Sequence, residues 1–310
     1  MLSRLRANPW LRTGIVLVVL ACVAYALHVR WDEAGAALRA LSPWVVLTAL
    51  AAAMAGLFGQ LLAWRCLLTD LGSALPLRVA ARVMFLGQLG KYLPGSVWAF
   101  VAQVELAHDQ QVPRARGVAA TALAVVVTLV VNVAVAAATL PIASPEAARR
   151  WWWVLVLAPA LLLLLRPRLV TALLRGVQRL VRGGRMIPES ELQQVSGYGL
   201  AGAVGWSVAA WLPLALHVWV LVAALGDTGV HTLPLAAGAY ALAWTLGLVV
   251  IVAPAGIGVR ELVLVVALAP VMDPGAALVV AALSRLVLTV ADLLWAALAT
   301  LAAQRHGNGP

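Results

Sequence analysis

The sequence predicts an all-α polytopic membrane protein, and three observations carry this prediction. Of the 310 residues, 64% are apolar and 11% are charged, with a mean hydropathy of +0.97, whereas soluble domains carry roughly 25% charged residues. Several apolar stretches reach the length of about 20 residues that a helix needs to cross a bilayer. Arginines cluster between these stretches, and the formal net charge is +10. We therefore expect a single membrane domain over 1–310.

Six stretches are expected to cross the membrane fully: 13–29, 44–64, 117–140, 151–165, 197–225 and 276–302. We interpret the first as an uncleaved anchor, because five further spans follow it. Two more apolar stretches, 82–107 and 235–272, are broken near their centres by Pro94-Gly95 and by the run PAGIG at 254–258. Because proline interrupts a helix, each is either a kinked span or a re-entrant hairpin of two short arms.

The distribution of basic residues favours the hairpins. With six full spans and two re-entrant hairpins, 15 basic residues fall in the two termini and in 65–82, 108–116 and 166–196, and the opposite loops hold four. The positive-inside rule then places both termini in the cytoplasm, and we expect a multi-pass protein of the cell membrane. Residues 166–185 alternate apolar residues with arginines at helical spacing. They predict a cytoplasmic, basic amphipathic helix, either a connector at the inner leaflet or a partner-binding surface.

A shift of the chain by 160 residues indicates an internal repeat, about 10–140 and 150–303. Glycine, proline and Asn/Asp matches distinguish it from chance alanine and leucine matches: Gly87 with Gly247, Pro94 with Pro254, and Asn132 with Asp292. Three full spans separate the two hairpins, so an odd number of crossings inverts the second repeat. Inverted repeats with broken helices are typical of transporters whose sites lie near the bilayer midplane.

Six ionisable residues lie within the apolar stretches, where a charge costs about 2.5–3.5 kcal/mol on insertion scales. They are Lys91, Glu105, Arg260, Glu261, Arg285 and Asp292. Three are cations and three are acids, so the set is neutral in sum. These charges either pair to hold the two hairpins against the bundle or line a polar cavity.

As a cavity, the three cations would hold an anionic headgroup, most simply a phosphate, which arginine binds in bidentate fashion. The acids would orient the cations or carry a coupled proton. Glu105 lies near the cytoplasmic end of its stretch and is equally well an interfacial charge. His217, close to Pro213, is expected to be a buried structural histidine. Neutral hydrogen bonds would come from Gln88, Tyr92, Ser96, Gln103 and Asn132.

Other functional classes find little support in the sequence. It contains no P-loop, no HExxH motif and no Cys/His cluster, and its two cysteines, Cys22 and Cys66, lie in or beside apolar spans. We therefore expect no enzyme activity, no cofactor, no metal site and no nucleic-acid partner.

Two motifs are similar to those of a known family. GKYLPGSVW at 90–98 and PAGIGVRE at 254–261, together with Arg285, resemble the membrane region of lysylphosphatidylglycerol synthases, a family of flippase-like integral membrane proteins. The resemblance covers roughly 10–302. It implies that the first motif comprises Lys91, Tyr92, Pro94 and Gly95, and the second Pro254, Gly256, Gly258, Arg260 and Glu261.

Three departures limit what the resemblance implies. Ala255 replaces the first glycine of the usual pair, Gln103 stands where relatives often carry arginine, and no acyltransferase domain is expected after residue 310. Aminoacyl transfer is therefore not implied, and lipid translocation is. The expected function is movement of an anionic or zwitterionic phospholipid, or a polyprenyl-linked lipid, between leaflets. The alternative is a non-transporting subunit that docks a lipid-modifying enzyme or glycosyltransferase through 166–185. Membrane lipids are the expected partners, beside such an enzyme or a second copy of the chain.

Overall fold

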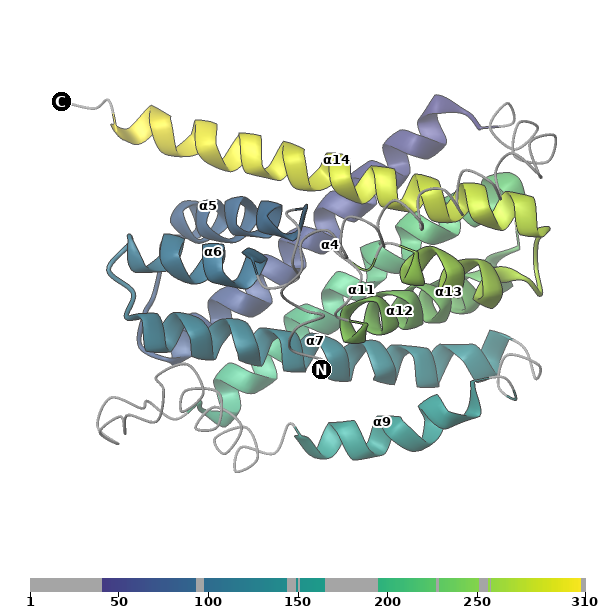
Figure 1. The fold of residues 1–310 in the computed structure, drawn as a ribbon, viewed down its shortest axis with the longest axis horizontal. Coiled ribbons are helices and arrows are strands. Elements are labelled where there is room, and N and C mark those ends of the chain that lie inside the picture. The colour runs from purple at the N-terminus through teal and green to yellow at the C-terminus, as the bar shows by residue number, and fades with distance from the viewer. Residues whose placement is uncertain are drawn as a thin grey trace, which may run out of the picture.

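The computed structural model describes residues 41–92, 98–143, 149, 151–164, 195–226, 229–250, 256 and 258–307, and every regular element in them is a helix (Figure 1). The elements are α4 (Pro43–Asp70), α5 (Leu77–Gln88), η1 (Leu89–Tyr92), α6 (Trp98–His108), α7 (Arg114–Ala143), α9 (Trp152–Leu164), α11 (Gly197–Leu225), η3 (Val230–Thr232), α12 (Leu233–Val249), α13 (Val259–Leu268) and α14 (Pro274–Gly307).

The prediction of an all-α multi-pass membrane protein is confirmed. Within the described residues, five helical segments are long and apolar enough to cross a membrane: Pro43–Asp70, Arg114–Ile142, Gly197–Leu225, Val230–Val249 and Pro274–Ala302. Four of them coincide with expected full spans. The expected span 13–29 and the expected amphipathic helix 166–185 lie outside the described residues.

Two segments differ in length from the prediction. The expected span 151–165 forms α9, which has 13 residues and is shorter than the roughly 20 that a crossing requires. The apolar stretch that was expected to begin at residue 235 begins at Val230. Helix η3 continues directly into α12, and the two helices together cover 20 residues. Pro234 causes no break because it lies in the first turn of α12, where a missing backbone N–H leaves no bond unmade.

The two broken stretches form two helix pairs that enter the bundle from opposite ends (Figure 1). We call α5, η1 and α6 the first hairpin, and α12 and α13 the second. The first hairpin opens at the end of the molecule where α4 and α14 finish, and the second opens at the other end. The breaks at Pro94, Gly95 and Pro254 lie outside the described residues. Re-entrance into a bilayer and the inverted repeat stay predictions.

Glycines allow the arms of each hairpin to approach closely. A Cβ atom on Gly87 of α5 would lie 2.8 Å from the Cα atom of Gln103 on α6. In the second hairpin, Gly256 and Gly258 have φ angles of 70° and 87°, a region that side chains with a Cβ disfavour. A Cβ atom on Gly256 would also lie 2.9 Å from the carbonyl oxygen of Gly247.

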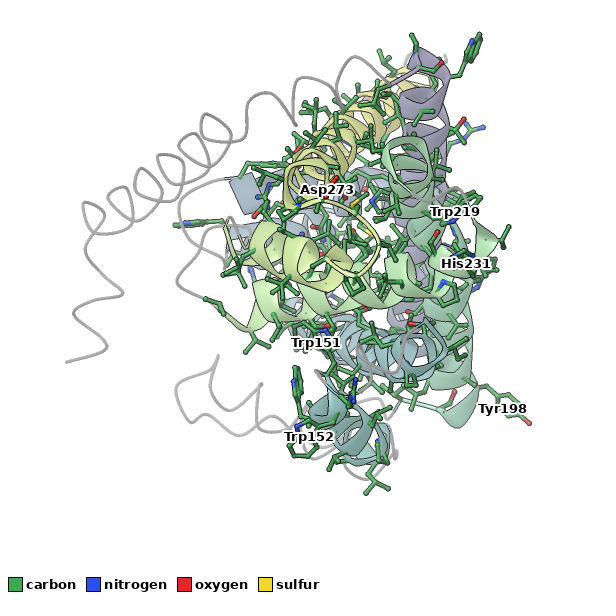
Figure 2. The ribbon with its side chains drawn as sticks, turned by 90° about the vertical axis from the view of Figure 1, so that its right-hand side faces the viewer. Trp151, Trp152, Tyr198, Trp219, His231 and Asp273 are labelled. Atoms are coloured by element: carbon green, nitrogen blue, oxygen red, sulfur yellow. The ribbon has the colours of Figure 1, made fainter. Side chains whose placement is uncertain are left out.

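The ends of the long helices lie at the same ends of the molecule as the topology used for the count of basic residues requires. The C-terminal ends of α4 and α14 lie with the N-terminal ends of α7 and α11 on the left of Figure 1, and their other ends lie on the right. Figure 2 looks onto that right-hand end, where Trp152 projects outward and is 62% exposed. An outward tryptophan near the end of a bundle suits the membrane–water interface.

Helix α14 is attached to the first half of the chain by an aromatic stack. The Trp295 ring stacks on Phe58 of α4 and on Phe85 of α5, with ring centroids 5.6 and 5.0 Å apart. Its Nε1 donates a hydrogen bond of 3.0 Å to the carbonyl oxygen of Met54. This contact places the neighbouring turn of α14, which contains Asp292, against the first hairpin.

Helices α4 and α11 run antiparallel and touch through glycines, which yields a stability prediction. A Cβ atom on Gly59 would lie 2.7 Å from Ala210 Cβ and 3.1 Å from its Cα. Gly59→Ala should therefore lower the free energy of unfolding by about 1–3 kcal/mol, the usual range for overpacking. Gly205→Ala on α11 is the matched control, because nothing lies within 4 Å of that position. Thermal unfolding in detergent micelles measures both, and equal melting temperatures would contradict the close packing.

Candidate functional site

A cavity of about 240 Å³ lies between the two hairpins and the long helices that flank them. Its walls come from both halves of the chain, including α7 from the first and α14 from the second. It brings together these residues expected at the site: Gln88, Lys91, Tyr92, Gln103, Asn132, Gly256, Arg260, Glu261, Arg285 and Asp292. Lining residues between Met84 and Gln103 and between Tyr240 and Leu264, far apart in sequence, thus face one cavity.

Asp292 of α14 binds the end of the first arm. Its Oδ2 lies 2.5 Å from the ammonium nitrogen of Lys91 and accepts a 2.7 Å hydrogen bond from the hydroxyl of Tyr92. The aspartate is 2% exposed, so the pair stabilises a carboxylate that would be costly to bury alone. The other oxygen, Oδ1, is buried without a hydrogen-bond partner among the described residues. Lys91, the single lysine of the sequence, thus links the first hairpin to α14.

Glu261 binds the second hairpin to the same helix. One carboxylate oxygen lies 3.0 Å from Nη1 of Arg285. The other accepts a 2.6 Å hydrogen bond from the backbone N–H of Gly258 at the start of α13, where a negative charge is favourable. Arg285 and Asp292 are seven residues, about two turns, apart and therefore share a face of α14. One helix face consequently holds both hairpins.

Arg260, the third cation that lines the cavity, lies on an aromatic ring and forms no ion pair with a described carboxylate. No carboxylate among the described residues pairs with it, its Nε is buried without a hydrogen-bond partner there, and its guanidinium lies 5.4 Å from the centre of the Trp244 ring. Gly247 makes room for it, because a Cβ atom at that position would overlap the Arg260 side chain. A guanidinium on an aromatic face keeps its donors available to a further acceptor.

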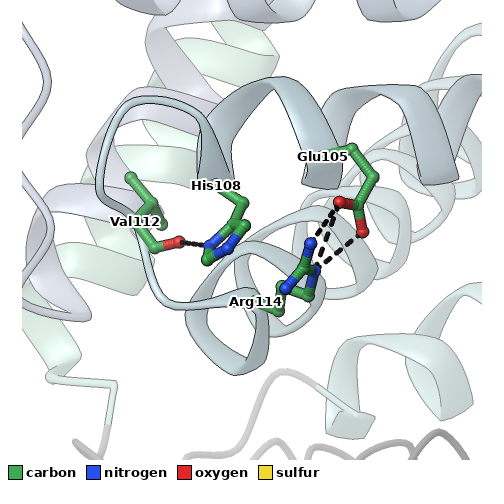
Figure 3. Close-up of polar contacts among 4 residues, drawn as sticks. All are labelled: Glu105, His108, Val112 and Arg114. Carbon is green, nitrogen blue, oxygen red and sulfur yellow. Dashed lines mark hydrogen bonds and ion pairs between the residues drawn. The ribbon is translucent and has the colours of Figure 1, made fainter.

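Glu105 does not lie in the cavity. It forms a bidentate pair with Arg114 across the α6–α7 turn, with N–O distances of 2.7–3.2 Å (Figure 3), and its side chain is 49% exposed. The hydrogen bonds from Arg114 hold the pKa of Glu105 below its usual range. The reason is helical geometry: Gln103 faces the cavity and is 3% exposed, and a residue two positions later points about 200° away. Of the two alternatives for Glu105, the geometry supports the interfacial charge.

The position of Glu105 changes the charge of the site. The described lining residues include three cations, Lys91, Arg260 and Arg285, and two carboxylates, Glu261 and Asp292. The cavity therefore carries an excess of one positive charge, whereas the six charges counted in the sequence cancel. Because the two carboxylates contact Lys91 and Arg285, the excess is located at Arg260.

The cavity faces of α7 and α14 correspond under the predicted repeat. Helix α7 lines the cavity with residues 121, 124, 125, 128 and 132, and α14 with 281, 284, 285, 288, 289 and 292. Each of the five α7 positions falls on an α14 lining position after the shift of 160. The chemistry differs, since Val125 and Asn132 correspond to Arg285 and Asp292. This agreement supports the repeat and divides the cavity into a neutral wall and a charged wall.

Several lining residues were missed by sequence reasoning. Gln60, Thr121, Thr128, Trp244 and Ser284 all face the cavity. Thr128 and Thr121 could have been found, because they lie four and eleven residues before Asn132, on the same helix face. No residue spacing predicts Trp244, because its contact with Arg260 depends on how α12 and α13 pack against each other.

His217 is buried, as expected, and lies behind the cavity wall. Its side chain is 0% exposed, and its Nε2 lies 3.0 Å from the hydroxyl of Ser284. The ring packs edge-on against Tyr240 at a centroid distance of 4.8 Å. In the part of the chain that the structure describes, no group of three or more His, Cys, Asp or Glu side chains could hold a metal ion.

The buried pair predicts non-additive effects on stability. Lys91→Met should lower the free energy of unfolding by about 2–3 kcal/mol, somewhat less than a fully buried pair, because the Lys91 side chain is 30% exposed. The double variant Lys91→Met/Asp292→Asn should recover most of that loss, since no charge is then left unpaired. Unfolding in micelles measures both variants. A double variant that is less stable than Lys91→Met would refute the pairing.

Comparisons with known proteins agree with the motifs. The chain matches the family described as Lysylphosphatidylglycerol synthase TM region over residues 10–296, a range that includes all the cavity-lining residues named above. A comparison with curated proteins finds no match. The resemblance drawn from GKYLPGSVW and PAGIGVRE is confirmed: the chain belongs to the family of lysylphosphatidylglycerol synthase membrane regions.

Proposed function

We propose that this protein moves an amphiphilic lipid with an anionic or zwitterionic headgroup, a phospholipid or a polyprenyl-linked lipid, between the leaflets of the cell membrane. The headgroup occupies the cavity between the hairpins, and the hydrocarbon tails stay in the bilayer. Family membership and five helices of membrane length support a lipid-related function in the membrane. Both termini are cytoplasmic in this proposal, as the distribution of basic residues along the sequence predicts.

The excess positive charge of the cavity carries the proposal. A buried cation is expensive unless an anion compensates it, and Arg260 has no carboxylate partner among the described residues. A phosphate would neutralise it with bidentate hydrogen bonds. Lys91 and Arg285 lie in the same cavity and can turn from their carboxylates toward the same anion. The headgroup itself thus supplies the negative charge that balances the excess cation of the lining residues.

The two ion pairs also suggest how binding leads to movement. Each hairpin is tied to α14 by one pair, Lys91 with Asp292 and Glu261 with Arg285. An anion that competes for Lys91 weakens the first tie, and one that competes for Arg285 weakens the second. A headgroup arriving from one leaflet would in this way loosen one hairpin while the other stays closed, which is the requirement of alternating access.

The alternative, a membrane subunit that docks an enzyme through 166–185, predicts a different result in the same assay. Purified protein in liposomes would then exchange no lipid on its own, and exchange or synthesis would need a co-purifying partner. Dithionite quenching of fluorescent lipids reports leaflet exchange in both cases.

Arg260 yields the sharpest functional prediction. Arg260→Gln should reduce exchange of an anionic lipid at least about tenfold, because a hydrogen bond to a charged group contributes about 1.5–3 kcal/mol. The fold should survive, since no carboxylate loses its partner. Arg114→Gln is the matched control: it removes the same charge from the exposed pair with Glu105 and should leave exchange unchanged. Equal rates in wild type and Arg260→Gln would rule out this site for the headgroup.

A further inference from the structure

We propose that the cavity binds its anion together with one proton, and that Asp292 is the group that takes up this proton. The proposal rests on the proposed function and specifies how lipid movement is coupled to energy. Without the anion, the Asp292 carboxylate is paired with Lys91 at 2.5 Å. When the anion takes over Lys91, a proton from water adds to Oδ1 of Asp292 and leaves a neutral carboxylic acid. Release of the anion returns the proton to water and restores the ion pair.

Asp292 contacts one cation and has little access to water. Its Oδ2 contacts Lys91 and accepts a hydrogen bond from the Tyr92 hydroxyl. Its Oδ1 is buried without a hydrogen-bond partner among the described residues, and the residue is 2% exposed. A carboxylate that loses its cation in such a place is costly to keep charged, whereas the protonated acid is neutral. The Tyr92 hydroxyl can stay bonded to Oδ2 in both forms.

The other charged groups of the cavity cannot take the place of Lys91. The described titratable and charged groups that line it around Asp292 are Lys91, Tyr92, Tyr240, Arg260, Glu261 and Arg285. Arg285 is held by Glu261 at 3.0 Å. Arg260 lies on the Trp244 ring and faces the anion under the proposed function. The two tyrosines carry no positive charge in either protonation state, so a proton is the remaining way to neutralise the aspartate.

The second carboxylate of the cavity does not need a proton. Glu261 accepts a 2.6 Å hydrogen bond from the backbone N–H of Gly258, at the positive end of α13. If the anion attracts Arg285, Glu261 therefore keeps a donor and a favourable helix end. Its side chain is also more exposed than that of Asp292, 13% against 2%. Of the two acids, Asp292 is the one whose charge depends on a cation that the anion takes away.

His217, behind the cavity wall, is the other group whose type titrates near neutral pH. Its Nδ1 contacts the carbonyl oxygen of Leu214, which can only accept, so Nδ1 carries the hydrogen. Its Nε2 then accepts from the hydroxyl of Ser284 at 3.0 Å. The side chain is 0% exposed, and no carboxylate among the described residues contacts it. A second proton on His217 would thus create an unpaired buried charge.

One proton for each anion keeps the charge of the cavity constant. The described lining residues carry an excess of one positive charge. A singly charged anion removes this excess, and the proton on Asp292 restores it. The first repeat adds no second acid, because Asn132 corresponds to Asp292 and Val101 to Glu261. Since the cavity has the same charge with and without its anion, a pH gradient drives net movement toward the alkaline side, and a membrane potential does not.

Titration calorimetry measures the proton directly. Short-chain phosphatidylglycerol is titrated into the detergent-solubilised full chain at about pH 7.5, in buffers with different heats of ionisation, which gives the number of protons taken up on binding. A phosphodiester is the suitable probe, because a phosphomonoester itself titrates at about pH 6. We expect about one proton for each lipid bound. The affinity should then fall up to about tenfold for each pH unit, since the bound form holds the extra proton.

Variants assign the proton to its residue. Asp292→Asn imitates the neutral acid, so it should bind the lipid without proton uptake and with an affinity independent of pH. Asp273→Asn is the matched control, because it makes the same change at an exposed position before α14 and asparagine caps a helix as well as aspartate does. It should keep the wild-type uptake. Infrared difference spectra should show the C=O band of a protonated carboxylic acid when lipid is added to wild type, which tests the proposal even if Asp292→Asn does not fold.

Liposomes with an alkaline interior test the coupling to transport. Wild type should collect fluorescent phosphatidylglycerol in the inner leaflet, beyond the level in liposomes without protein. A potassium-diffusion potential of either sign, at equal pH on both sides, should cause no net accumulation. Asp292→Asn should lose the response to the pH gradient, and Asp273→Asn should keep it.

The outcomes separate this proposal from the proposed function. Lipid binding without proton uptake and without a carboxylic acid band, or equal uptake in wild type and Asp292→Asn, would overturn the role of Asp292 and leave lipid movement in place. Proton uptake that needs Asp292 but is accompanied by no leaflet exchange would support binding with a proton and reject transport. A folded wild-type chain that neither binds nor exchanges the lipid would overturn both.

Discussion

The arrangement of the polar cavity depends on the burial of Asp292. A carboxylate inside an apolar bundle is stable only with a cation and hydrogen-bond donors beside it, and Lys91 and Tyr92 supply both. These partners belong to the end of the first arm, so the pair fixes where that arm lies against α14. Trp295, one turn further along α14, stacks on Phe58 and Phe85 and keeps the helix in the register that the pair requires. The single lysine is thus a positional constraint as well as a charge.

The same helix face imposes a second constraint through Arg285. Because Glu261 both accepts from the backbone of Gly258 and contacts Arg285, the start of α13 cannot move independently of α14. The positive φ angles of Gly256 and Gly258 bring the chain back into the bundle at that point. Arg260 follows directly and lies on Trp244. The described part of this motif, Gly256 and residues 258–261, therefore places Glu261 against Arg285 and Arg260 in the cavity.

The sequence was a good guide where the physics is local or periodic. Apolar length located the helices that end at Asp70 and begin at Pro274, and the cost of burying charge selected Lys91, Arg260 and Asp292 as residues of one site. For Glu105 the sequence left two alternatives open, because position within an apolar stretch does not say which side of α6 a residue faces. The Arg260–Trp244 contact could not be predicted either, because it depends on how α12 and α13 pack together and not on the residue spacing within either helix. The stretch expected from residue 235 begins at Val230 in the structure, because proline in the first turn of a helix is tolerated.

Helices α7 and α14 face the cavity at positions that match under the predicted repeat, but with different chemistry. With the α14 residues at the matched positions, α7 would add a further arginine and a second aspartate, and each of these buried charges would need a partner of its own. Here Asp292 corresponds to Asn132, and Arg285 to Val125, so one wall is charged and the other only hydrogen-bonding. Under the proposed function, the phosphate of the headgroup would lie toward Arg260, between these two walls. Restoring symmetry with Asn132→Asp would add a third carboxylate to the cavity, beside Glu261 and Asp292. It would cancel the excess positive charge of the cavity and disfavour a bound anion; the neutral amide at this position preserves that excess.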